Sequence, residues 1–277
     1  MGMTGNDRVT GEKIIAQAKA FGADLAGIAR VADLKDSPSH WLSQIMPDFE
    51  GVGTHPSDQK KRGIVQWPDG AKSAIVIAVA HPRSRPELDW WIDSAGKGNT
   101  AGNRSLIAVT KKLADWLEHT TDMRCFRLPY NIEKGGIYLK DAAVLAGLGC
   151  IGMNNMVITP QFGPRHRIRA MLVDAALPST GSLDFDPCNK CDMPCRKVCP
   201  QLSFNRPVYS HAAYGCETLP GRTGVYDRFR CNEQMLIDEA NAETIDSEER
   251  KAAVRRVKYC RRCEMACPIG SRPSGER

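Results

Sequence analysis

Two cysteine-rich stretches decide how this chain is organised. The first is Cys188-Asn-Lys-Cys-Asp-Met-Pro-Cys-Arg-Lys-Val-Cys199-Pro200, and the second is Cys260-Arg-Arg-Cys-Glu-Met-Ala-Cys267-Pro268. Of the 11 cysteines among 277 residues, all but Cys125 and Cys150 follow residue 187. Cysteines clustered in this way, in a chain without an export signal, indicate metal or cluster ligation rather than disulfide bonds.

The spacing of these cysteines predicts two four-iron four-sulfur (4Fe–4S) clusters. Thiolates are soft ligands, and each such cluster takes four of them. In two-cluster ferredoxins, a C-x2-C loop binds one cluster and a more distant cysteine, followed by proline, reaches the other. The first cluster would take Cys188, Cys191, Cys195 and Cys267. The second would take Cys199, Cys260, Cys263 and one further cysteine.

The eighth ligand is either Cys216 or Cys231. We favour Cys231, because it opens an expected helical segment that runs toward the second stretch. Three residues, including Pro194, separate Cys191 from Cys195 where ferredoxins have two, so we expect a distorted loop there. Structural zinc is the rival interpretation of paired C-x2-C motifs, but the number of cysteines and the two Cys-Pro endings favour clusters.

The residues before the cysteines alternate between helical and strand patterns. We expect helices at 10–22, 105–119 and 139–148, and strands at 23–29, 73–80, 125–128, 155–159 and 167–174. The run Ser73–Ala80 (SAIVIAVA) suits a strand buried on both faces. Residues 33–70 read as long polar loops. The chain is therefore expected to form an α/β sandwich over residues 1–180 and a smaller cysteine-rich domain over residues 181–277.

Charge and hydropathy suggest the surroundings of the protein. The net charge is +6, and Lys251, Arg255, Lys258 and Arg262 recur at helical spacing. They predict a solvated helix face or a docking face for an acidic electron donor or nucleic acid. No RNA-binding signature supports the last option. Because the sequence lacks an 18-residue apolar run and a signal peptide, we expect a cytoplasmic protein with no membrane partner.

A glycine-punctuated turn follows the helix expected at 139–148. Gly147, Gly149 and Gly152 either let the backbone approach a large flat ligand or serve tight packing of the turn itself. Neither phosphate-binding glycine fingerprint fits. A ferredoxin does not need 180 additional residues, so we expect the first domain to hold a substrate or a second cofactor. Cys125 and Cys150 are expected to be buried small hydrophobic residues rather than ligands.

The sequence AGLGCIGMNNMVITPQFGPRHRIRAMLVDAALP (146–178), followed by the paired cysteine stretches, resembles the cobalamin-dependent iron–sulfur reductases. This superfamily contains epoxyqueuosine reductase and the respiratory reductive dehalogenases. The phrase IYLKDAAVLAGLG (137–149) looks closest to the dehalogenases. AFGADLAGIARV (20–31) and AKSAIVIAVAHP (71–82) look like the first two strands of epoxyqueuosine reductase. The resemblance spans roughly residues 12–270.

The resemblance implies an α+β protein, in which a nitroreductase-like α/β sandwich binds a corrinoid and a ferredoxin-like domain holds two 4Fe–4S clusters. The clusters would deliver electrons to cobalt for reduction of a small organic substrate such as an epoxide, thioether or halide. Carried over by position, the corrinoid contacts are Ala80, His81, Gly149, Ile151, Gly152, Met153, Asn154 and the strand from Met156. The family's cobalamin usually has no protein histidine below cobalt, so His81 is not expected to be a ligand.

A reductase also needs an acid that protonates the reduced product. Glu133 falls where epoxyqueuosine reductase keeps its catalytic aspartate. Tyr130, Tyr138 and Lys140 are alternatives, and Arg165 would help to bind an anion. Each has an ordinary alternative: Glu133 as a surface residue in a loop, for example, and Lys140 as a solvated side chain on its helix.

Several departures from the family limit what it implies about the substrate. Residues 99–105 lack the tyrosine- and histidine-containing phrase of epoxyqueuosine reductase, and neither a tRNA-binding helical repeat nor a twin-arginine signal is present. We expect a short cytosolic relative that acts on a small molecule, takes electrons from reduced ferredoxin or flavodoxin, and has no nucleic-acid partner. The alternative is an electron-transfer protein that reduces a corrinoid for a partner enzyme.

Overall fold

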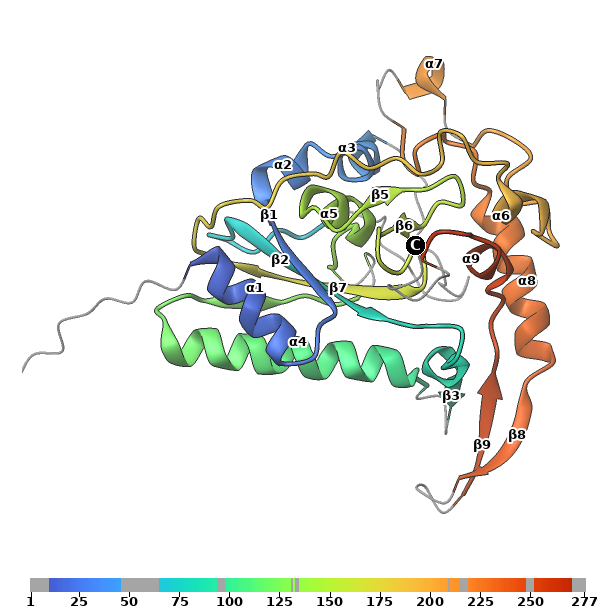
Figure 1. The fold of residues 1–277 in the computed structure, drawn as a ribbon, viewed down its shortest axis with the longest axis horizontal. Helices are drawn as coiled ribbons and strands as arrows, with labels where there is room; N and C mark the ends of the chain where they lie inside the picture. The colour runs from blue at the N-terminus through green and yellow to red at the C-terminus, as the bar shows by residue number, and fades with distance from the viewer. Residues whose placement is uncertain are drawn as a thin grey trace, which may run out of the picture.

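The computed structural model describes residues 10–45, 65–93, 98–130, 132, 135–208, 210–214, 219–247 and 252–270. At its centre lies a four-stranded antiparallel sheet in the order β1-β2-β7-β4 (Figure 1). These strands are β1 (Leu25–Arg30), β2 (Ser73–Ala80), β7 (His166–Val173) and β4 (Cys125–Arg127). β2 pairs with β7 along its whole length and is buried on both faces for its first six residues, as the apolar run predicted.

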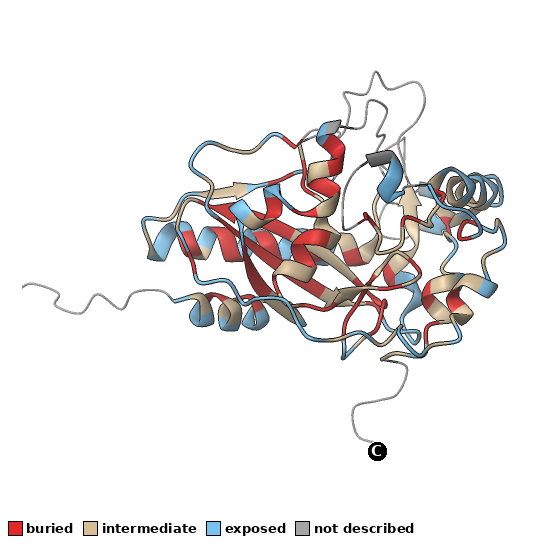
Figure 2. Cartoon of the chain, turned by 90° about the horizontal axis from the view of Figure 1, so that it is seen from above, coloured by how far each residue is buried: buried red, intermediate tan, exposed pale blue. Residues whose placement is uncertain are grey.

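Helices cover both faces of this sheet. On one face lie α1 (Gly11–Ala20) and α4 (Ala101–Thr120); on the other lie α2 (Val31–Lys35), α3 (Pro38–Ile45) and α5 (Leu139–Leu145) (Figure 1). Ile14, Leu113 and Met171 belong to the first interface, while Ala142 and Leu172 belong to the second. Figure 2 shows the buried residues concentrated between these layers. The hydrophobic core therefore lies in the α/β part.

The structure corrects the loop expected over residues 33–70. Two short helices, α2 and α3, occupy residues 31–45, and residues 46–64 lie outside the described residues. A distant carboxylate stabilises the first turn of α3, because the Ser39 amide donates to Asp141 Oδ2 at 2.8 Å. A carboxylate at a helix N-terminus satisfies amides that have no partner within the helix. The two residues lie about a hundred positions apart in the sequence, so the residues around α3 could not predict this contact.

The cysteine-rich part contains short elements. They are α6 (Pro194–Lys197), α7 (His211–Tyr214), α8 (Arg228–Ala240), β8 (Glu243–Ser247), β9 (Ala252–Val257) and α9 (Arg262–Met265). β9 pairs with β8 on one side and with β3 (Trp91–Asp93) on the other. β3 follows the short 3-10 helix η1 (Pro86–Asp89). This second sheet joins the cysteine-rich part to the α/β part, because β3 comes from the α/β part (Figure 1).

The prediction that the basic residues near the C-terminus form one face of a helix is wrong. Arg255 lies on strand β9, Lys258 follows it, and Lys251 lies outside the described residues. Pairing on both edges of β9 overrides the helical spacing of the charges. Lys258 and Arg256 both bind the Glu243 carboxylate across the strand pair. Within the described segments, no helix is long and apolar enough to cross a bilayer.

Candidate functional site

The eight cysteines predicted as ligands form two groups by their electrostatic influence on one another, although among the described residues no three His, Cys, Asp or Glu side chains are placed to hold a single metal ion. The inner group is Cys188, Cys191, Cys195 and Cys267; the outer group is Cys199, Cys231, Cys260 and Cys263. Burial, and then the nearby thiols of the other three inner cysteines, raise the pKa of Cys195 to about 11. Burial, followed by charges that include all three other outer cysteines, raises the pKa of Cys263 to about 12. Each group therefore brings together cysteines from both sequence stretches.

This donor set suits a positively charged metal centre. Several thiols packed in a partly buried space resist ionisation, because each thiolate would repel the others. A bound metal removes that penalty, since it coordinates the thiolates directly. The chemistry of the two groups therefore fits iron–sulfur clusters, which take four thiolates each.

The loop between Cys191 and Cys195 is distorted, as its extra residue predicted. Met193 adopts a left-handed backbone conformation with φ of 52°, and Pro194 then begins α6. Cys231 lies in the first turn of α8, within the outer group. Cys216 lies outside the described residues, so its exclusion as a ligand remains a prediction.

The turn between β5 (Cys150–Ile151) and β6 (Val157–Ile158) is held against the cysteine-rich part. Arg196, which follows Cys195, donates from Nε to the Met153 carbonyl at 2.7 Å. Arg222 donates to the Ile151 carbonyl at 3.4 Å. The two arginines place the predicted corrinoid-contact turn beside the inner group.

Lys140 lies on the other side of this turn. Its Nζ donates to the Asn155 carbonyl at 3.0 Å and to Asn155 Oδ1 at 2.9 Å. Asn155 has a left-handed backbone conformation with φ of 58°, which the lysine helps to hold. Burial lowers the pKa of Lys140 to about 8. Lys140 is therefore not the solvated helix residue of the ordinary interpretation, and its immediate contact is the turn.

The glycines of the turn are explained by packing within the chain. A Cβ on Gly149 would lie 2.0 Å from the Ile158 carbonyl oxygen, and one on Gly152 would lie 2.5 Å from Ile158 Cγ1. Gly147 has φ of 70°, and a Cβ there would meet the Gly181 carbonyl oxygen at 2.4 Å. Of the two interpretations of these glycines, the structure supplies direct evidence for tight packing.

The side chains at the tip of the turn retain features of a ligand site. Ile151, Met153 and Met156 are half-buried. Asn154 is buried, and its Nδ2 has no hydrogen-bond partner, whereas its Oδ1 accepts from the Met156 amide at 3.3 Å. A buried amide donor without a partner is costly unless a ligand or water satisfies it. Asn154 is therefore the residue of this turn whose chemistry points most directly to a bound group.

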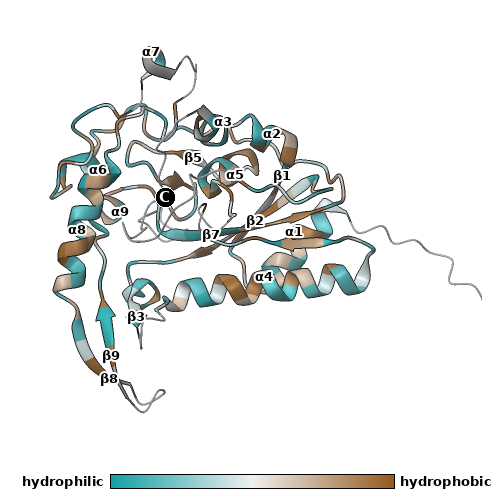
Figure 3. Ribbon diagram, turned by 180° about the vertical axis from the view of Figure 1, so that it is seen from behind, coloured by the Kyte–Doolittle hydropathy of each residue, from teal (hydrophilic) through white to brown (hydrophobic). Residues whose placement is uncertain are grey.

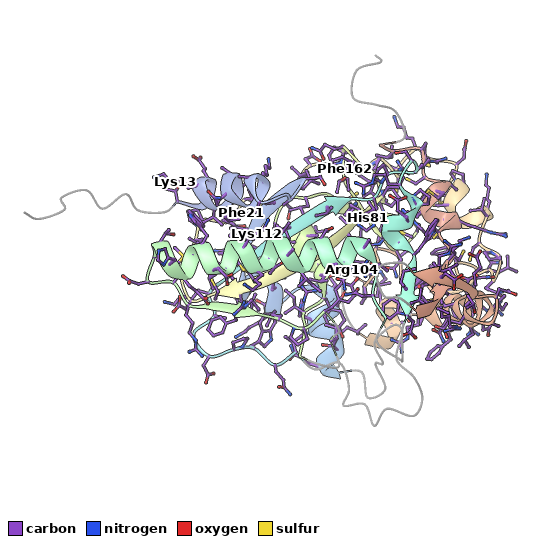
Figure 4. All side chains as sticks on the ribbon, turned by 90° about the horizontal axis from the view of Figure 1, so that it is seen from below. Lys13, Phe21, His81, Arg104, Lys112 and Phe162 are labelled. Carbon is purple, nitrogen blue, oxygen red and sulfur yellow. The ribbon has the colours of Figure 1, made fainter. Side chains whose placement is uncertain are left out.

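The His81 side chain is enclosed by protein rather than open to a cofactor. Its Nδ1 makes a 2.9 Å hydrogen bond with Asp89 Oδ1, and its ring packs so closely on α4 that a Cβ on Gly102 would lie 1.9 Å from it. His81 follows β2 and lies next to the N-terminal half of α4 (Figure 4). The imidazole therefore contacts Asp89 and α4, while its buried Nε2 has no hydrogen-bond partner among the described residues. Its neighbour Ala80 is half-buried.

A buried ionic junction, which the sequence did not reveal, joins the two parts of the chain. Asp89 binds Arg167 at 2.6 Å and Arg261 at 2.5 Å, and Glu264 binds Arg167 at 3.1 Å. Burial alone would raise the pKa of Asp89, but the hydrogen bond from His81 and the two arginines lower it overall. The hydrophilic start of β7, visible in Figure 3, was the available signal.

Arg165 holds the C-terminal cysteine stretch. Its guanidinium is buried and donates to the Cys267 carbonyl at 3.0 Å, to the Glu264 carbonyl at 3.3 Å and to the Ile269 carbonyl. These three acceptors lie between residues 264 and 269, around the last cysteine. The geometry therefore supports a positioning role for Arg165, and its expected binding of an anion stays a prediction.

The remaining acid candidates differ in their surroundings. Tyr130 is 50% exposed and lies near Arg167 and Arg169. Tyr138 packs edge-on against buried His40, with ring centroids 4.9 Å apart. Glu133 lies outside the described residues. Among the described candidates, Tyr130 therefore combines exposure with cationic support.

Comparisons with known proteins give related sequences. No protein-family model matches the chain. An epoxyqueuosine reductase of Gloeobacter violaceus is 26% identical over 209 residues, which are 72% of this chain and 62% of that protein. One of Pseudomonas aeruginosa is 27% identical over 147 residues, 52% of this chain and 36% of that protein. The chain thus spans only part of the length of the curated relatives it matches.

Solved structures share its fold. Epoxyqueuosine reductase from Streptococcus thermophilus has a TM-score of 0.57 and 21% identity, covering 96% of this chain and 66% of that one. An epoxyqueuosine reductase solved with an epoxyqueuosine-modified tRNA stem loop has a TM-score of 0.57 and 20% identity, covering 94% of this chain and 64% of that one. A catabolic reductive dehalogenase has a TM-score of 0.60 and 18% identity, covering 94% and 32%.

Proposed function

We propose that the chain is a cobalamin-dependent reductase of a small organic substrate. Its similarity to epoxyqueuosine reductases in sequence, and the fold it shares with them and with a reductive dehalogenase, support this proposal. Two 4Fe–4S clusters would pass electrons singly to the corrinoid. The observation that carries this proposal is the division of eight cysteines into two groups, with the inner group beside the β5–β6 turn.

Specific residues would hold each group. The inner and outer cysteines would each ligate one cluster, and Arg165 would fix the carbonyl of Cys267. Asn154 Nδ2, a buried donor without a protein partner, suits an amide carbonyl at the edge of a corrinoid. Half-buried Met153 and Met156 would contact its apolar surface. When bound, the corrinoid supplies the reducing metal centre of the reaction.

The protein itself would supply the proton. Tyr130 is exposed enough to meet a substrate, and Arg169 lies nearby. A phenol is one of the side-chain groups that donate a proton in general acid catalysis. We assign the proton donor to Tyr130 among the described residues. Lys140 would hold the turn through Asn155.

Reconstitution and substrate assays would test the proposal. The anaerobically purified chain, supplied with iron, sulfide and cobalamin, should bind cobalamin with a change in its visible spectrum, and Asn154→Leu should weaken that binding. Tyr130→Phe should bind cobalamin normally and lose turnover. If both clusters assemble but cobalamin does not bind, the result would instead favour the alternative, an electron-transfer protein that serves a partner.

The substrate panel should include both chemistries of the relatives. The neighbour solved with a tRNA stem loop leaves the expected absence of a nucleic-acid partner without support. An epoxyqueuosine-modified stem loop and a brominated hydroxybenzoate should therefore be assayed side by side, since the latter occupies a solved dehalogenase. Turnover of one and not the other assigns the substrate class.

A further inference from the structure

The two cysteine groups differ in how they face the rest of the protein. The inner group lies against the α/β part, because Arg165 binds the Cys267 carbonyl and Cys188 is close enough to influence the Cys150 thiol on β5. The outer group includes exposed Cys260 and Cys231 of α8, a helix that buries none of its residues. α8 also lies at the margin of the molecule (Figure 1). Electrons that travel to the β5–β6 turn would therefore enter the protein at the outer group.

An open hollow of 690 Å³ lies beside the outer group, between α6 and α9. It is lined by Lys197, Val198, Cys199, Pro200, Arg262, Met265 and Ala266. Cys199 is the one outer cysteine in this lining. Val198 is 39% exposed there. The hollow therefore brings solvent close to a predicted cluster ligand, over a largely apolar floor.

Two exposed cations flank this floor. Lys197 ends α6 and Arg262 begins α9. Throughout the described segments, neither side chain forms an ion pair or a hydrogen bond, unlike Arg256 and Lys258 nearby, which bind Glu243. Both positive charges are therefore available to an external acidic group.

We propose that this hollow is the docking site of an acidic one-electron carrier protein, with Lys197 and Arg262 as its electrostatic contacts. The inference rests on the proposed function, because it requires a cluster behind Cys199. The carrier would lose one electron and the outer cluster would gain it, and no bond would be made or broken. Charge pairs of this kind raise the rate of encounter by tenfold or more at low salt. Small contact surfaces, below about 1,200 Å², suffice for transient electron transfer.

Stopped-flow reduction by flavodoxin hydroquinone, an acidic carrier, tests this site. In the cluster-loaded protein, the double variant Lys197→Glu, Arg262→Glu should be reduced at least roughly tenfold more slowly than the wild type at low salt. The neutral variant Lys197→Gln, Arg262→Gln should fall between them. Added salt should slow the wild type and have little effect on the neutral variant, because screening removes only interactions between charges.

Two controls separate docking from cluster assembly. Lys112→Glu changes an exposed charge on α4, away from the cysteine-rich part (Figure 4), and should leave the rate unchanged. Reduction by a photoreduced deazaflavin, which needs no docking, should be equal in all variants. Equal flavodoxin rates in the wild type and the charge-reversed variant, with equal iron contents, would overturn the docking site alone. A wild type without cluster absorption would overturn the proposed function and this inference with it.

Discussion

His40 shows how a buried titratable side chain sets the pH range of stability. It lies between Trp67 and Tyr138, hydrogen-bonds through Nδ1 to Ser37 Oγ at 2.7 Å, and accepts the Tyr138 amide through Nε2. Burial lowers its pKa from 6.5 to about 3. The unfolded chain therefore binds a proton as the pH falls through 6.5, while the folded protein does not until about pH 3. The contribution of neutral His40 to the free energy of unfolding is therefore fully present above pH 6.5 and is lost progressively as the pH falls toward 3.

Replacement of His40 should flatten this dependence. In His40→Gln, the free energy of unfolding should lose up to about 1.4 kcal/mol less per pH unit than in the wild type as the pH falls below 6.5. Denaturant titrations across this range would measure the slope. The matched control is exposed His119→Gln on α4, which should keep the wild-type slope. Identical slopes for all three proteins would refute the assignment.

Lys140 stabilises the backbone of the β5–β6 turn through hydrogen bonds from its ammonium group. Its ammonium binds both oxygens of Asn155, a residue with a left-handed conformation that costs energy without glycine. Lys140→Met should lower the free energy of unfolding by ~1–3 kcal/mol, because the turn loses charged hydrogen bonds. Lys111→Met, at an exposed position, is the control and should change it little. A wild-type midpoint in denaturant for Lys140→Met would count against this role.

At the scale of elements, the β5–β6 hairpin depends on a glycine. A Cβ on Gly149 would lie 2.0 Å from the Ile158 carbonyl oxygen, so Gly149→Ala must force the two strands apart. Overpacking of this kind costs ~1–3 kcal/mol. Cobalamin binding should also weaken, since the turn beyond these strands carries Asn154. The exposed neighbour Gln161→Ala should change neither property. Normal stability and binding in Gly149→Ala would contradict this explanation.

The sequence predicted the regular elements of the sheet well. Ser73–Ala80 forms β2 with the predicted bounds, because an apolar run buried on both faces carries its own signal. The predictions failed where distant contacts decide the structure. Asp141 stabilises α3 from a hundred residues away, and double-edge pairing makes β9 a strand. Cysteine spacing predicted the two groups, whereas the roles of Arg165 and Lys140 required knowledge of their partners.

At the scale of the whole molecule, a buried ionic junction couples the two parts. Glu264 is 2% exposed and binds Arg167 and Arg261, which both also bind Asp89. Glu264→Gln leaves buried arginine charge poorly compensated, so the free energy of unfolding should fall by roughly 3–5 kcal/mol. The neighbouring exposed Arg262→Gln should have little effect on stability. Unfolding monitored by tryptophan fluorescence would compare them, and equal midpoints would exclude the junction as a major stabilising contact.

The grouping of cysteines from both stretches is the central claim, and an iron count tests it most directly. After anaerobic reconstitution, the wild type should hold about eight iron atoms and eight sulfides per chain, four for each cluster. Cys188→Ser and Cys267→Ser should each approach about four iron atoms and lose the same paramagnetic resonance signal, because both cysteines belong to the inner group. Loss of different signals, or a wild type that holds zinc in place of iron, would contradict the account.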